Sequence, residues 1–198
     1  KYLGIVSSKA KQLETLVKDL FDYTRYDRNK VKIKKEILDL NLFVPQLVDE
    51  FYPSFMDHQL ECRTAFYEGA LNIEGNGELL ARAIGNLISN AIKFSHKDTV
   101  VMVHVKIQDV ADENKTGEGN GKEVLVTVSD RGCGIKKEDQ GKLLNEATHF
   151  TTFGTDSEEG SGLGLLLCKD FVSKNHGRLW FTSEEGVGSN FNFTIPIK

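Results

Sequence analysis

The sequence has few of the residues that a disulfide-bonded secreted protein, a metal-stabilised protein or a membrane-spanning protein would need. Its 198 residues include only three cysteines, which are scattered and show no CxxC or Cys/His metal spacing. This pattern argues against a disulfide framework and favours a reducing compartment. No apolar run approaches the ~20 residues of a membrane span. The first residue is Lys1 and no signal-peptide pattern follows it, so we interpret the chain as a fragment of a longer protein.

The chain also lacks a strong charge of either sign. It has 25 Lys and Arg against 29 Asp and Glu, which gives a net charge of −4. So small a charge gives no reason to expect binding to nucleic acid or to an anionic membrane. The length fits one domain of ordinary size plus an appendage.

That appendage is predicted in residues 1–28, which carry a heptad pattern. Apolar and small residues recur there in alternating steps of three and four, with charged residues between them. A helix with such a seam needs a partner helix, which this segment does not supply; the alternative is an amphipathic helix packed on its own domain. The seam consists of Leu3, Val6, Ala10, Leu13, Val17, Leu20 and Thr24.

The remaining residues alternate between strand and helix patterns without a regular βαβ repeat. We therefore predict an α+β fold: a two-layer sandwich with a mixed, mostly antiparallel sheet and helices on one face. Strands are predicted over 31–38, 60–66, 70–74, 99–108, 123–130, 178–184 and 190–197. Helices are predicted from Asp39 or Asn41 to about His58 with a break or kink at Pro53, over 77–95, near 136–144, and from about Ser161 to Asn175.

The helix predicted over 77–95 has an unusual polar face. Arg82, Asn86, Asn90 and Lys93 fall within about 80° of arc on the side opposite its apolar residues. Asn is a poor residue for an exposed helix, but amide oxygens can ligate Mg²⁺ and a Lys can meet phosphate charge. The alternative is a solvated face.

A strand ends in an acidic, glycine-containing stretch at "VTVSDRGCGI" (126–135). Asp130 could project from the strand end and accept a hydrogen bond from an exocyclic amine, while Gly132 and Gly134 let a flat ring approach the backbone. A tight turn is the alternative, because Asp and Gly are both turn residues.

Alternating glycines precede the last predicted helix at "GSGLGLLL" (160–167). The stretch matches neither the GxxxxGK[ST] phosphate loop nor the dinucleotide-binding GxGxxG pattern. Exposed backbone N–H groups at a helix start favour an anion such as phosphate; the alternative is a hinge without a ligand.

In combination, these motifs resemble the catalytic, ATP-binding domain of sensor histidine kinases, within the gyrase-type (Bergerat) ATPase superfamily. "NLISNAIKFS" is similar to its N box, "DRGCGI" to its first glycine box, "HFTTFGT" to its F box and "GSGLGLLLCKDF" to its second glycine box. "LVKDLFDYTRYDRNKVKI" resembles the end of the second dimerisation helix. The resemblance implies a partial dimerisation and phosphoacceptor hairpin over 1–30 and an ATP-binding catalytic domain over 31–198.

The resemblance implies ATP and Mg²⁺ as ligands. Asn90 would coordinate Mg²⁺, Asn86 and Lys93 would lie beside the phosphates, and Asp130 would receive the adenine amino group. Residues 143–160 would form a lid over the nucleotide. The other residues placed around ATP are Phe94, Gly132, Gly134, Ile135, Phe150, Phe153, Gly160, Ser161, Gly162, Leu163, Gly164, Leu165 and Ser189.

The activity implied is transfer of the γ-phosphoryl group of Mg-ATP to a histidine. None of the chain's five histidines has the sequence context of a phosphoacceptor, so the acceptor would lie on a helix missing from this sequence. We assign no catalytic acid or base, because an imidazole nitrogen already has a free lone pair.

The implied partners are the dimerisation helices of the same protein and the receiver domain of a response regulator, with a homodimer expected for the full-length protein. The implied location is a cytoplasmic domain, and a membrane anchor elsewhere in the parent protein is left open. Two alternatives stay open: an ATPase or protein serine kinase of the same superfamily, and a nucleotide-free interaction module.

Overall fold

The computed structural model describes residues 34–110, 121–145 and 162–197, together with Ala10, Leu13, Val17, Phe21 and Thr155. The strands are β1 (Glu36–Asp39), β2 (Glu61–Ala65), β3 (Asn72–Gly75), β4 (Val100–Asp109), β5 (Lys122–Ser129), β6 (Arg178–Glu184) and β7 (Gly188–Pro196). The helices are α2 (Leu40–Glu50), α3 (Tyr52–Asp57), α4 (Gly77–Phe94), α5 (Lys137–Gln140) and α6 (Gly164–Lys174).

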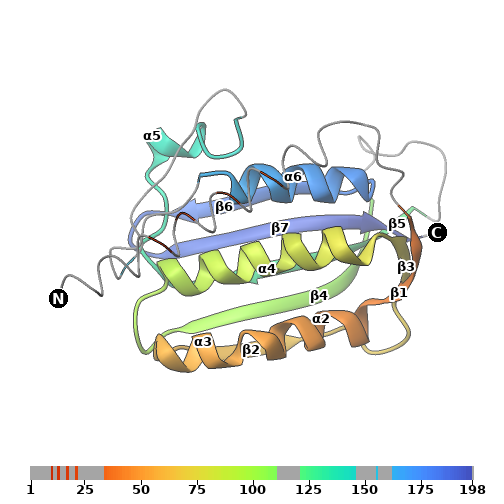
Figure 1. Cartoon of the computed structure of the whole chain (residues 1–198), viewed down its shortest axis with the longest axis horizontal. Helices are drawn as coiled ribbons and strands as arrows, with labels where there is room; N and C mark the ends of the chain where they lie inside the picture. Colours follow the sequence, from red (N-terminus) through yellow and green to blue (C-terminus); the bar gives the residue numbers. More distant parts are fainter. Residues whose placement is uncertain are drawn as a thin grey trace.

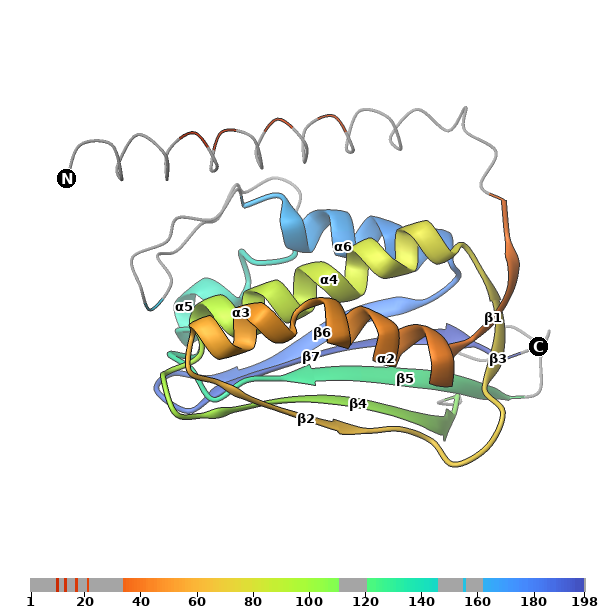
Figure 2. The same ribbon diagram turned by 60° about the horizontal axis from the view of Figure 1, so that its bottom comes forward.

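A five-stranded sheet forms one layer of the domain, and α2, α3, α4 and α6 cover one of its faces (Figures 1 and 2). The strand order is β2-β4-β5-β7-β6, and β1 pairs with β3 in a separate two-stranded sheet. Among the strands that the structure describes, β2 and β4 pair in parallel and the other pairs are antiparallel. This confirms the predicted α+β sandwich with a mixed sheet.

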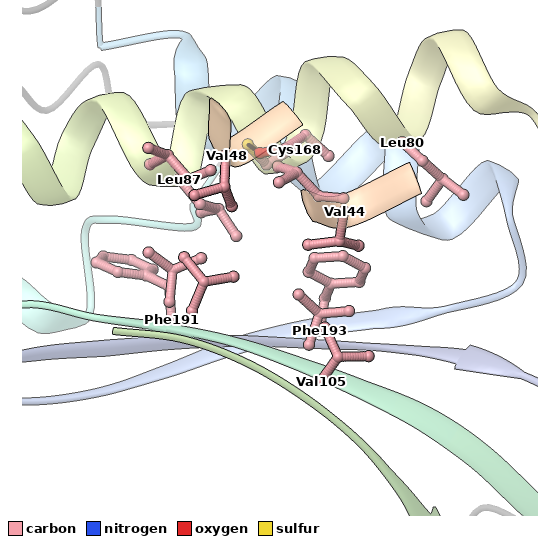
Figure 3. Close-up of a cluster of buried hydrophobic side chains, with 14 of the residues drawn as sticks. Val44, Val48, Leu80, Leu87, Val105, Cys168, Phe191 and Phe193 are labelled. Carbon is pink, nitrogen blue, oxygen red and sulfur yellow. Dashed lines mark hydrogen bonds between the residues drawn. The ribbon is translucent and has the colours of Figure 1, made fainter. Parts of the chain in front are cut away.

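The core lies between the two layers. In Figure 3, Val44 of α2 and Leu87 of α4 point toward the sheet, while Phe191 and Phe193 of β7 point toward the helices. These four side chains are between 0% and 6% exposed. The alternation of β5 and β7 explains this, because every second side chain of a strand faces the same side.

The first helical segment is divided near Pro53, as predicted. Asp39 caps α2, its carboxylate accepting a hydrogen bond from the Asn41 backbone N–H at 3.0 Å. The helix ends at Glu50, and Pro53 lies in the first turn of α3. Proline fits a first turn, because the N–H it lacks has no partner within the helix there.

The central helix, α4, forms as the sequence predicts. The Asn76 side chain caps it by accepting from the Leu79 N–H at 2.9 Å. Its apolar stripe repeats with the helical period and is buried between the sheet and the flanking helices. The buried residues are Leu79, Leu80, Ala83, Ile84, Leu87, Ile88, Ala91 and Ile92.

The N-terminal heptad segment is described at four positions. Ala10, Leu13, Val17 and Phe21 are helical and exposed. The first three belong to the predicted seam and Phe21 does not; the other seam residues, and so the predicted long helix, lie outside the described residues. No helix within the described part of the chain is long and apolar enough to cross a membrane.

Candidate functional site

The described parts of the predicted motifs lie toward one end of the domain, at the left of Figure 1, on the C-terminal half of α4, the start of α6, the end of β5 and the β6–β7 turn. Asn86 of α4 donates from Nδ2 to the Gly164 carbonyl oxygen at the start of α6, at 3.4 Å. Ser95, directly after α4, forms a β-bridge with Gly132. The fold therefore brings together segments that are up to about 100 residues apart.

Asp130 is a buried carboxyl at the end of β5. It is 7% exposed, and its Oδ1 accepts two backbone hydrogen bonds, from Gly132 N at 3.0 Å and Ser189 N at 3.2 Å. The Ser189 hydroxyl also favours the ionised form of this carboxyl and so lowers its pKa. The second oxygen, Oδ2, takes part in neither backbone bond. Asp130 and Ser189, both predicted for the adenine end, are thus in contact.

Burial changes the acidity of Asp130. Desolvation raises the pKa of this carboxyl to about 6, although the two backbone N–H groups, the Ser189 hydroxyl and nearby His96 all favour the charged form. The carboxyl therefore changes charge close to physiological pH. Because the pKa is raised above its value of 3.8 in an unfolded chain, Asp130 by itself adds stability as the pH falls through 6 toward 3.8.

The two glycines after Asp130 are required by contacts within the protein. A Cβ on Gly132 would lie 1.8 Å from the Phe94 carbonyl oxygen, and one on Gly134 would lie 1.9 Å from the Glu184 carbonyl oxygen. Gly134 also has a φ of +61°, in the left-handed region. We expected these glycines to make room for a ring; the structure shows that they first make room for the end of α4 and for the β6–β7 turn.

The polar face of α4 lies beside the start of α6. Asn86, Asn90, Lys93 and Phe94 are all partly buried, and the Lys93 ammonium lies 4.9 Å from the centre of the Phe94 ring. Arg82, on the same predicted face, forms an ion pair with Glu78 at 3.2 Å. The described residues contain no cluster of three or more His, Cys, Asp and Glu side chains that could hold a metal ion.

The last helix begins later than predicted. Gly162 has a φ of +72°, which no α-helix allows, and α6 starts at Gly164 instead of about Ser161. Its first internal hydrogen bond runs from the Leu167 N–H to the Leu163 carbonyl oxygen, so the amides of residues 164–166 have no partner within the helix. Within the described segments, no side chain caps this helix start.

Four predicted site residues, Phe150, Phe153, Gly160 and Ser161, lie outside the described residues. Thr155 is described, and sequence reasoning did not select it although it ends the "HFTTFGT" motif. Its N–H donates to the Lys93 carbonyl oxygen at 3.1 Å, and its hydroxyl lies 3.0 Å from that oxygen and 3.1 Å from the Ser95 carbonyl oxygen. Thr155 thus contacts the C-terminal end of α4.

Sequence reasoning also missed Ser183, which lies opposite Ser189 in the β6–β7 pair. Its hydroxyl accepts from the Ile135 N–H at 2.9 Å and lies 3.0 Å from the Ser189 hydroxyl. Gln140 supports the same corner by donating to the carbonyl oxygens of Ile135 and Ser183 at 2.9 and 3.0 Å. A predicted hairpin with the turn "EEGVG" would have placed the two serines opposite each other.

Residues 75–198 match the family described as histidine kinase-, DNA gyrase B- and HSP90-like ATPase. The chain belongs to this family. All the described motifs of the site lie within the matched range, so the resemblance predicted from the four sequence boxes is confirmed. The family assignment supports the interpretation of this site as an ATP-binding site.

Relatives over the whole chain are sensor kinases. The chain is 26% identical to the sensor protein kinase WalK of Staphylococcus aureus over 202 residues, which cover 100% of this chain and 45% of that protein. The form of WalK from strain JH9 shows the same identity and is covered to 31%. The chain thus spans less than half the length of these curated relatives.

Solved structures share the fold. The histidine kinase AdeS of Acinetobacter baumannii has a TM-score of 0.70 at 17% identity, with 99% of this chain and 84% of that chain covered. Full-length ShkA, solved in complex with AMPPNP, has a TM-score of 0.75 at 20% identity, with 98% and 38% covered. These two solved structures therefore share the architecture described above.

Proposed function

We propose that this chain is the ATP-binding catalytic part of a sensor histidine kinase, which transfers the γ-phosphoryl group of Mg-ATP to a histidine on a helix outside this sequence. The observation that carries the proposal is that three kinds of group lie toward one end of the domain: a buried carboxylate, a pair of amide side chains with a lysine, and a helix start that no described side chain caps. Each group suits a different part of ATP.

The adenine end would lie at Asp130. Its ionised carboxyl accepts hydrogen bonds only, and Oδ1 already serves Gly132 and Ser189. Oδ2 would then accept the exocyclic amine of the base. Gly134 and Ile135 follow in the same loop and would border the ring.

The phosphate end would lie between α4 and α6. The amides of residues 164–166 offer donors at the positive end of a helix dipole, and Lys93 adds a positive charge. The hydrogen bond from Asn86 to Gly164 uses its NH₂ group and not its oxygen. The amide oxygens of Asn86 and Asn90 are hard ligands, which fits Mg²⁺ held mainly by phosphate oxygens and water.

The chemistry asked of these residues is positioning and charge neutralisation. Phosphoryl transfer passes through a loose transition state, so fixed donors and a cation stabilise the charge on the transferred group. Mg²⁺ would supply part of that neutralisation when bound. The acceptor imidazole brings its own lone pair, so no general base is needed here. Dimerisation through the N-terminal helix, and a response regulator receiving the phosphoryl group, complete the proposal.

The metal ligand can be tested by Asn90→Ala. We expect Mg²⁺ to raise the ATP affinity of the unmodified chain. In the variant we expect the increase in affinity caused by Mg²⁺ to be at least about tenfold smaller, which corresponds to 1.4 kcal/mol. Calorimetric titration with ATP in the presence of Mg²⁺ or EDTA measures this. Asn72→Ala, at an exposed position in β3, is the matched control. An unchanged gain in the variant would exclude Asn90 as a ligand.

ATP binding should depend on pH through Asp130. A carboxyl with a pKa of about 6 is mostly ionised at pH 7 and mostly protonated at pH 5, so we expect affinity to fall about tenfold between these values. The phosphates of ATP titrate in a similar range. The same titration of Asp130→Asn separates the effect of Asp130 from that of the ATP phosphates, because the part of the affinity loss that is due to protonation of Asp130 should be missing in that variant. An identical pH profile for both proteins would contradict the assignment.

Phosphoryl transfer can be tested directly. The chain is mixed with a separately produced phosphoacceptor hairpin and labelled Mg-ATP. We expect label on the hairpin that is lost in acid, because phosphohistidine is acid-labile. Acid-stable label would favour a serine kinase, phosphate release without transfer would favour an ATPase, and failure to bind any adenine nucleotide would favour an interaction module.

A further inference from the structure

The Ser183 hydroxyl sits at the centre of a hydrogen-bond chain behind Asp130. It accepts from the Ile135 N–H at 2.9 Å and lies 3.0 Å from both the Gly188 carbonyl oxygen and the Ser189 hydroxyl. Ser189, 6% exposed, in turn donates its backbone N–H to Asp130 Oδ1 at 3.2 Å, and its hydroxyl stabilises the ionised carboxyl, which lowers the pKa of Asp130. A chain of two hydroxyls therefore links Asp130 to a backbone carbonyl.

We propose that Ser183 is a positioning residue for nucleotide recognition: its hydroxyl sets the direction in which Ser189 donates, and so which form of the Asp130 carboxyl faces the base. This inference rests on the proposed function, in which Asp130 accepts the adenine amino group. Ser183 itself makes no contact with the base in this scheme; it acts through Ser189.

Counting protons gives the chain two arrangements, because each hydroxyl has one proton to donate. When Asp130 is ionised, it can only accept, so Ser189 donates to it and Ser183 donates to Ser189. When Asp130 is protonated, it can donate to Ser189, Ser189 donates to Ser183, and Ser183 donates to the Gly188 carbonyl oxygen. Every donor has an acceptor in both arrangements, and the direction of both hydroxyls reverses between them.

Removal of the Ser183 hydroxyl would affect the two arrangements unequally. The ionised form keeps the bond from Ser189 to Asp130. The protonated form leaves the buried Ser189 proton without its acceptor, and an unsatisfied buried donor is costly. Ser183→Ala should therefore favour ionised Asp130.

The other titratable groups that interact with Asp130 are His96, which follows α4 and acts on the carboxylate, and Cys133 in the same loop, on which the carboxylate acts. His96 attracts the carboxylate, while the pKa of the Cys133 thiol is raised by burial and by Asp130. Neither contacts the hydroxyl chain through a hydrogen bond described above, so neither reproduces the effect of Ser183.

The test is the pH dependence of ATP affinity from pH 5 to pH 8, measured by calorimetry on the whole chain. In Ser183→Ala we expect the midpoint of the acid-induced loss to move down by about one pH unit. The ratio of the affinities at pH 7.5 and pH 5 should therefore be smaller in this variant than in the wild type, whatever the absolute affinity at pH 7.5. Ser183→Thr keeps a hydroxyl and should restore the original midpoint, and Ser173→Ala, at an exposed position in α6, is the matched control.

A double-mutant cycle links the effect to Ser189. In a Ser189→Ala background, Ser183→Ala should shift the midpoint no further, because the chain to Asp130 is already broken. If Ser183→Ala does not fold, Ser183→Cys takes its place, since a thiol fills a similar volume but hydrogen-bonds weakly.

Different results would contradict the role of Ser183 and the proposed function. An unmoved midpoint in Ser183→Ala, or an equal shift in the Ser189→Ala background, overturns the role of Ser183 while ATP binding stands. A wild-type chain that binds no ATP, or an Asp130→Asn variant that binds it like the wild type, overturns the proposed function itself.

Discussion

Asp130→Asn is expected to weaken ATP binding by roughly ten- to a hundredfold, which corresponds to the 1.5–3 kcal/mol of a hydrogen bond to a charged group. The internal contacts of Asp130 explain the direction of the effect. Two backbone N–H groups point at Oδ1, so an Asn side chain would place its oxygen there and its NH₂ group at the position of Oδ2. The NH₂ group of the Asn side chain and the amino group of adenine, which are both donors, would then face each other.

The same geometry predicts a change in base preference. A base with a carbonyl oxygen in place of the amine could accept from the Asn NH₂ group, so the ratio of ATP to GTP affinity should fall in the variant. Competition titration with both nucleotides measures it. Asp109→Asn is the matched control, because Asp109 is exposed and pairs with Lys122 at the opposite end of the β4–β5 ladder. Wild-type affinity and selectivity in Asp130→Asn would rule out Asp130 as the adenine acceptor.

Gly132→Ala is expected to have a large effect on folding. Its new methyl group would lie 1.8 Å from the Phe94 carbonyl oxygen and 3.0 Å from the Ser95 Cα. Both neighbours are backbone atoms, and Cys133 N–H also donates to the Phe94 oxygen at 3.1 Å, so the contact cannot be relieved by turning a side chain. We expect the free energy of unfolding to fall by about 3 kcal/mol, at the upper end of what overpacking costs.

Gly141→Ala provides the contrast for that measurement. Gly141 has a φ of −67°, and a Cβ there would meet nothing within 4 Å. This substitution should leave stability unchanged or raise it by about 0.4–1 kcal/mol, because alanine restricts the unfolded chain. Urea unfolding of both variants beside the wild type gives the comparison. Equal stabilities for the two variants would show that the loop after Asp130 can move away from α4.

The sequence predicted elements whose pattern is local. The stripe of α4 and the alternation of β4, β5 and β7 repeat with a fixed period, and the core that they form follows from that period. The break at Pro53 also follows from a local property, the missing N–H. Asp130 and Asn86 were found because polar residues stand at the end of a strand and on one side of a helix.

The remaining features depend on contacts between distant segments. The start of α6 was misplaced because the left-handed φ of Gly162 is a property of the folded backbone and not of the glycine pattern. The reason for Gly132 is a carbonyl oxygen at residue 94, and the role of Ser183 requires both the β6–β7 register and the docking of Ile135 on it. Contacts between distant segments do not repeat at a fixed interval along the sequence, so a periodic pattern cannot predict them.

The position of β7 has a consequence for how the domain is made. β7 is the last strand along the chain, yet it lies between β5 and β6 in the sheet, and β6 joins the sheet only through it. Ser189 and Gly188, which complete the surroundings of Asp130, are part of this strand. A ribosome-bound chain that has not yet released residues 188–196 therefore has neither a complete sheet nor the Ser189 backbone N–H that binds the Asp130 carboxyl. The long-range pairing of β5 with β7 should be among the slow steps of folding.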